Sequence, residues 1–155
     1  MNPYAPPEAS VQDLPSKPGS ALKAIALGLA VDVGGSLVAA IILAAIYGAV
    51  LAATGVPRED IAAVMQASAT DSWFFYIGSL VGSSFSVLGG YVCARIARRS
   101  EMKLGAILAA MSAVSGFFLG GDEMQLGTNL SLTLLTFGAV LVGVRLGLGK
   151  NRAGR

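Results

Sequence analysis

The chain has 155 residues, of which 54% are hydrophobic and only 13% are charged, against about 25% charged residues in a typical soluble domain. This balance excludes a soluble globular protein, and the formal charge of +2 is too small to indicate a nucleic-acid partner. Histidine is absent and Cys93 is the sole cysteine, so the sequence offers no internal disulfide and no Cys or His metal cluster. We therefore expect no metal, no cofactor and no enzymatic activity.

The first twenty residues contain five of the six prolines. Such a segment forms neither helix nor sheet, which predicts a disordered Pro-rich tail over residues 1–20. Its two PxxP spacings, Pro3 to Pro6 and Pro15 to Pro18, are typical of a solvated tail and also of a docking peptide for a partner. Because the tail is polar and the apolar stretch after it is long, we expect an uncleaved anchor and no signal peptide.

Four apolar stretches follow, and each approaches or exceeds the length of about 20 residues that a helix needs to cross a bilayer core. They predict an all-α integral membrane bundle of four transmembrane helices within residues 21–150, followed by a short basic tail at 151–155. The stretches cover residues 24–53, 73–94, 104–120 and 128–148.

Asp32 is the only acidic residue inside these stretches. A carboxylate at the centre of a spanning helix costs about 2.5 to 3.5 kcal/mol, so such residues usually face the bundle interior and have a partner. Its depth stays open, since residues 33–53 are long enough to span alone and the two glycines after Asp32 permit a bend. One interpretation is an intramembrane charge pair with Arg95 or Arg145, and the other is an ion or proton relay.

The loop at residues 54–72 has its own helical pattern. Pro57 suits a first helical position, and Glu59 and Asp60 complement the dipole of a first turn. Apolar side chains then recur at helical spacing. This pattern predicts a short amphipathic helix that lies on the outer membrane surface or over the bundle. The recurring apolar residues are Ile61, Val64 and Met65.

Small residues recur at every fourth position of the second stretch, and a shorter set occurs in the fourth. Helices in lipid associate by close backbone approach, which small side chains permit. The pattern therefore predicts a glycine-zipper interface, either within one bundle or between two copies of the chain. Its members are Gly78, Gly82, Ser86, Gly90 and Ala94, with Ala139, Gly143 and Gly147 in the fourth stretch.

The other polar side chains in the stretches are hydroxyls and one amide. Hydroxyls in spanning helices bond to their own helix or to a neighbouring one, and Asn129 stands where it can cap the outer end of the fourth stretch. The hydroxyl residues are Ser79, Ser83, Ser84, Ser112, Ser115, Ser131, Thr133 and Thr136.

If the four stretches alternate in direction, almost all basic residues lie on one side of the membrane and most of the acidic loop residues lie on the other. Because basic residues concentrate in short cytoplasmic loops, we expect both termini to be cytoplasmic. The high Gly and Ala content and the short loops favour a bacterial inner membrane. The basic side holds Lys17, Lys23, Arg95, Arg98, Arg99, Lys103, Arg145, Lys150, Arg152 and Arg155, and the other side holds Arg58, Glu59, Asp60, Asp71, Asp122 and Glu123.

The opening NPYAPP, followed by a Pro-rich tail and several spans, resembles the start of small, uncharacterised four-span inner-membrane proteins of bacteria. The run GGYVCARIAR, from Gly89 to Arg98, is similar to the end of a span in such proteins. The resemblance implies a membrane location and no established activity.

We expect a multi-pass inner-membrane protein with a structural or interaction role, as an accessory subunit. The alternative is a small dimeric secondary transporter in which Asp32 is the carboxylate that couples to an ion or proton. The expected partners are the lipid bilayer and either a second copy or another membrane protein, with no nucleic acid.

Overall fold

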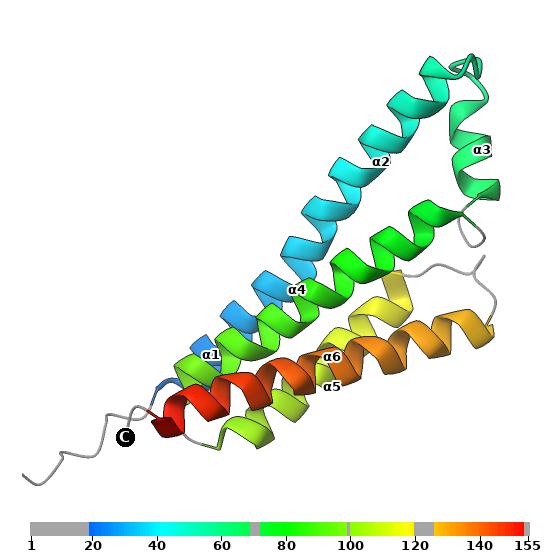
Figure 1. Cartoon of the computed structure of the whole chain (residues 1–155). Coiled ribbons are helices and arrows are strands. Elements are labelled where there is room, and N and C mark those ends of the chain that lie inside the picture. Colours follow the sequence, from blue (N-terminus) through cyan, green and yellow to red (C-terminus); the bar gives the residue numbers. More distant parts are fainter. Residues whose placement is uncertain (1–18, 69–71, 99, 120–125, 154–155) are drawn as a thin grey trace, which may run out of the picture.

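The computed structural model describes residues 19–68, 72–98, 100–119 and 126–153. All regular secondary structure in these residues is helical, which confirms the predicted all-α class (Figure 1). Residues 1–18 of the Pro-rich tail and the acidic loop at 120–125 lie outside the described residues. The elements are α1 (Ala21–Leu29), the π-helical turn η1 (Ala30–Gly34), α2 (Gly35–Ala53), α3 (Ile61–Ala67), α4 (Trp73–Ala97), α5 (Glu101–Leu119) and α6 (Leu126–Ala153).

Four helical segments are long and apolar enough to cross a membrane, which confirms the multi-pass character of the chain. They are Ala21–Ala53, Trp73–Ala97, Glu101–Phe118 and Leu126–Asn151. The first is continuous through α1, η1 and α2. The helices extend beyond the apolar stretches, because Arg, Lys and Glu at their ends favour helix even where they are too polar for hydrocarbon.

The short helix α3 begins one turn later than its sequence pattern predicts. Pro57 to Asp60 forms a turn in which the Asp60 amide donates to the Pro57 carbonyl at 3.0 Å, so Pro57 precedes the helix. α3 packs on α2 at Gly48, where a Cβ would meet the side chains of Ile61 and Met65 at 3.8 and 3.9 Å. That α3 lies on the outer membrane surface stays a prediction.

One end of the bundle has a continuous core of small and medium side chains. α1, the C-terminal half of α4, the N-terminal half of α5 and the C-terminal half of α6 meet there (Figure 1). Small residues bring the helices into backbone contact, as expected for association in lipid. We call this region the packed half. Its buried core consists of Ala24, Cys93, Ala94, Ala97, Leu108, Ala109, Val140 and Val144.

The other end is loosely assembled. α2 has no buried residue, and no Cα atom of α2 lies within 8 Å of one in α5 or α6. Figure 1 shows α2 leaning away from the other long helices, with α3 running back toward the start of α4. Tyr47 of α2 stacks on Phe74 of α4, with ring centroids 4.6 Å apart. We call this region the open half; it is built from α2, α3, the N-terminal parts of α4 and α6 and the C-terminal part of α5.

Candidate functional site

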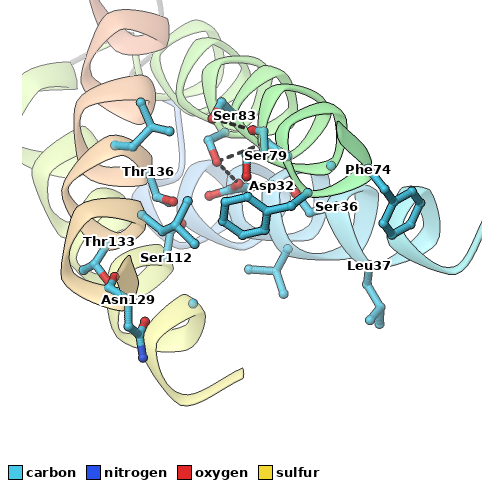
Figure 2. Close-up of a pocket in the computed structure, with 18 of the residues that line it drawn as sticks. Asp32, Ser36, Leu37, Phe74, Ser79, Ser83, Ser112, Asn129, Thr133 and Thr136 are labelled. Carbon is cyan, nitrogen blue, oxygen red and sulfur yellow. Dashed lines mark hydrogen bonds between the residues drawn. The ribbon is translucent and has the colours of Figure 1, made fainter. Parts of the chain in front are cut away.

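Asp32 lies at the centre of η1, where the packed half meets the open half. Its side chain is only 3% exposed. The Oδ1 atom accepts a hydrogen bond from the Ser86 hydroxyl of α4 at 2.7 Å (Figure 2). The Oδ2 atom is buried and has no hydrogen-bond partner in the part of the chain that the structure describes. The carboxylate is therefore only half satisfied.

Two glycines place Asp32 against α4. A Cβ on Gly89 would approach the Asp32 Cβ and the Gly28 carbonyl oxygen, each at 2.7 Å, and a Cβ on Gly28 would approach the Gly89 carbonyl oxygen at 3.0 Å. The two backbones can therefore come this close only without side chains. Asp32 then faces Ser86, one turn before Gly89. The wide turn of η1 is itself typical of functional positions, where π-bulges are frequent.

Asp32 borders a chamber of about 460 Å³ in the open half. This volume falls within the range of about 300 to 1,000 Å³ that is usual for small-molecule sites. Figure 2 shows Ser79 and Ser83 beside Asp32, with Asn129, Thr133 and Thr136 of α6 on the other side. No described residue that lines the chamber is basic. The lining consists of Asp32, Val33, Ser36, Leu37, Met65, Phe74, Phe75, Gly78, Ser79, Gly82, Ser83, Ser86, Ser112, Gly116, Asn129, Leu132, Thr133, Leu135 and Thr136.

The hydroxyl groups of the lining are biased toward accepting hydrogen bonds. Ser83 donates its proton to the Ser79 carbonyl at 2.7 Å, and Thr133 donates to the Asn129 carbonyl at 2.8 Å. A hydroxyl that has used its proton in this way presents only oxygen lone pairs to a ligand. The chamber therefore combines one carboxylate with several acceptor oxygens, which suits a cationic hydrogen-bond donor.

A second buried polar atom is unsatisfied. Ser112 of α5 is only 3% exposed, and its hydroxyl oxygen has no partner within the described ranges. Buried polar atoms are nearly always hydrogen-bonded in folded proteins. Asp32 and Ser112 line the same chamber, so its wall contains two polar side chains with hydrogen-bonding capacity that no described residue uses.

The structure does not form the charge pair that the sequence suggests between Asp32 and a basic residue. Arg95 donates from Nη1 to the Asn151 Oδ1 atom at 3.1 Å, and Arg145 is exposed. Arg95 lies nine residues beyond Ser86, which is about 13 Å along the helix at 1.5 Å per residue. That distance takes its guanidinium to the far end of the packed half, where Asn151 lies.

The small residues of the predicted zipper fall into two groups. Gly90 lies against the Val140 carbonyl, and Gly143 lies against the Val87 carbonyl. A Cβ on Gly147 would meet the Ala94 Cβ at 2.7 Å. These residues pack α4 against α6. The second group, Gly78 and Gly82, makes no such contact: a Cβ on either residue would meet no atom within 4 Å, and both residues line the chamber.

Two members of the predicted zipper remain. Ser86 donates a hydrogen bond to Asp32 and is therefore more than a small packing residue. Ala139 on α6 is half-buried. The sequence analysis missed the roles of Ser86 and Ser112. A usable signal was present in α4, because Ser79, Ser83 and Ser86 follow the spacing that puts side chains on one helical face.

No family model, curated protein or solved structure matches this chain. The resemblance of its NPYAPP and GGYVCARIAR segments to four-span bacterial proteins therefore stays a prediction. The case for a function rests on the chamber and its carboxylate.

Proposed function

We propose that this chain is a multi-pass membrane protein that binds a small monovalent cationic solute inside the bilayer and carries it across. The observation that carries this proposal is the buried carboxylate of Asp32, which borders the chamber with one oxygen unpartnered. Ionisable residues inside a bilayer commonly mark substrate or ion pathways.

The charge of the site favours a ligand with a single positive charge. An ionised carboxylate removed from water is costly unless a cation or a set of hydrogen bonds compensates it. Ser86 supplies one hydrogen bond, and the described lining supplies no basic side chain. A bound cation would compensate the charge, and a proton on Asp32 would replace that cation during the return step. This exchange is the elementary requirement of a proton-coupled transporter.

A structural role as an accessory subunit is the second candidate. It is favoured by α2, which has no buried residue and has no Cα atom within 8 Å of one in α5 or α6. That free surface could receive a helix of a second copy or of another membrane protein. Such a role requires no ligand in the chamber, so a binding experiment separates the two candidates.

We further propose a bacterial inner-membrane location with both termini cytoplasmic. The start of α1, the ends of α4 and α6 and the start of α5 gather at the packed half (Figure 1), and they carry Lys23, Arg95, Lys103 and Lys150. This clustering supports the orientation because basic residues favour the cytoplasmic side. Reporter fusions after Arg155 should be active inside, and a fusion that is active only outside would overturn this orientation.

The binding proposal is tested with the full chain in lipid nanodiscs and a panel of small alkylammonium ions, each paired with the neutral alcohol of the same shape. We expect calorimetry to detect binding of at least one ammonium ion. Asp32→Asn should weaken that binding about tenfold or more, because a charged hydrogen bond contributes about 1.5 to 3 kcal/mol. The asparagine keeps the volume and can still accept from Ser86, so the helical content should not change.

Two serine variants sharpen this test. Ser86→Ala keeps the carboxylate, so this variant should still bind ammonium ions. Its circular dichroism spectrum shows whether the helical fold is intact. Ser84→Ala is the matched control, since Ser84 is exposed and donates to its own helix at the Leu80 carbonyl. Ammonium ions that bind Asp32→Asn as well as the wild type, or no better than their alcohols, would refute the cation site. Uptake into proteoliposomes under a proton gradient then tests transport.

A further inference from the structure

Part of the chamber wall belongs to the lateral surface of the bundle. Leu37 of α2 and Leu135 of α6 both line it, yet their side chains are 56% and 50% exposed. Both belong to segments that can cross a membrane. We call this side of the chamber, where no Cα atom of α2 lies within 8 Å of one in α6, the lateral opening. In a bilayer this opening faces hydrocarbon.

Described residues also border the chamber along the axis of the bundle. The packed half lies on one side of Asp32, with its buried core of Ala, Val, Leu and Cys side chains. At the other end α3 runs between α2 and α4 (Figure 1) and contributes Met65 to the lining. The lateral opening therefore offers an approach to the chamber from the side of the bundle, between α2 and α6.

We propose that the ligand is a bilayer-resident amphiphile with a primary ammonium group, which reaches Asp32 through the lateral opening. This inference rests on the proposed cation site and adds its substrate class. The ammonium would lie at Asp32 and Ser112, whose unpartnered oxygens accept hydrogen bonds. The apolar chain would pass Leu37 and Leu135 into the lipid.

The donor count selects a primary ammonium over a quaternary one. A primary ammonium carries three N–H donors, which match the free Oδ2 atom, the Ser112 hydroxyl and the remaining acceptor oxygens of the wall. A quaternary ammonium has no N–H and would leave both buried oxygens unsatisfied, at a cost of about 1 to 3 kcal/mol for each. A free long-chain amine and the headgroup of phosphatidylethanolamine both supply the required chemistry.

Photolabelling in nanodiscs of phosphatidylcholine tests the proposal. The probe is a sixteen-carbon primary amine with a diazirine in its chain, and its control is the corresponding alcohol. We expect the amine to label peptides around Leu37 and Leu135 about tenfold more than the alcohol, which corresponds to one charged hydrogen bond. Asp32→Asn should reduce amine labelling to the level of the alcohol. Equal labelling by both probes in the wild type would overturn the proposal.

The route is tested separately by narrowing the opening. Leu37→Trp should slow Asp32-dependent labelling severalfold, because the indole fills the gap. Val38→Trp is the matched control: Val38 is the next residue, is 58% exposed and does not line the chamber, so it should label like the wild type. If both tryptophans slow labelling equally, or neither does, the ligand does not use this opening.

Two further comparisons identify the source of the ammonium and the cause of a failure. Adding phosphatidylethanolamine to the discs should lower the labelling if the headgroup is the natural ligand, and should leave it unchanged if a free amine is. If short, water-soluble ammonium ions bind in an Asp32-dependent way but the long amine does not label, the amphiphile proposal fails and the cation site stands. If neither ligand binds, both proposals fail.

Discussion

The packed half and the open half are built from the same kinds of residues but reach opposite results. In the packed half, Gly90 and Gly143 bring α4 and α6 into backbone contact. In the open half, Gly78 and Gly82 lie about three and two turns before Gly90 on α4, yet a Cβ at either position would meet nothing within 4 Å. Glycine therefore allows two helices to touch in the packed half, whereas in the open half it leaves part of the chamber unfilled.

The partner helix decides which result a glycine produces. The backbone of α6 near Val140 lies against Gly90. In the open half no atom lies within 4 Å of a Cβ built on Gly78 or Gly82, and no Cα atom of α2 lies within 8 Å of one in α6. A spacing of four residues specifies a smooth helical face, but it does not specify whether another helix lies on that face. Asp32 lies at the boundary, with one carboxylate oxygen bonded to Ser86 and the other buried without a partner among the described residues.

Leucine substitutions on the two sides of this boundary should give the largest difference. Gly90→Leu forces a side chain into the α6 backbone, and it should lower the free energy of unfolding by about 3 kcal/mol, the upper end of the usual cost of overpacking. Gly82→Leu enters the chamber, so it should change the stability by less than about 1 kcal/mol while it abolishes ammonium binding. Unfolding in mixed micelles and calorimetry measure the two quantities.

Alanine variants at these positions control for the loss of glycine itself. Gly82→Ala and Gly90→Ala both raise helix propensity by about 1 kcal/mol, so only the contact with α6 distinguishes them. We expect Gly82→Ala to be neutral or stabilising and Gly90→Ala to be destabilising. If leucine lowered the stability equally at the two positions, the open half would be as tightly packed in mixed micelles as the packed half.

Much of the fold follows from apolar length, because a helix that crosses hydrocarbon must be long and apolar whatever it contacts. Four segments long and apolar enough to span a membrane are present, as this reasoning predicts. Which faces meet does not follow from it. The proposed partner of Asp32 was a basic residue from the same side, but Arg95 bonds to Asn151 and the hydrogen bond to Asp32 comes from Ser86.

The chamber itself was not predictable, since a cavity depends on the angle between helices rather than on any single helix. Asn129 illustrates the difficulty. Its position near the start of the fourth stretch predicted a cap, but α6 begins at Leu126 and Asn129 is buried inside the helix. Its amide donates to the Phe117 carbonyl of α5 at 3.5 Å, and its side chain lines the chamber. The hydrogen bond from Asn129 could be recognised only once the position of α5 was known.

The smallest expected effect concerns Asn151, whose amide ties α6 to α4 and α5 at the far end of the packed half. It donates to the Ala94 carbonyl at 3.0 Å and to the Glu101 carboxylate at 3.4 Å, and it accepts from Arg95. Asn151→Ala should cost about 1 kcal/mol, the usual net value of a partly buried hydrogen bond.

The adjacent exposed residue Lys150 provides the matched control for this change, and Lys150→Ala should have no measurable effect on unfolding in mixed micelles. Ammonium affinity should be the same in Asn151→Ala as in the wild type, because Asn151 shares no partner with Asp32 and distant sites act independently. A change in affinity would instead show that the packed half controls the chamber. Asn151 would then belong to a device that opens or closes the site from the end of the bundle.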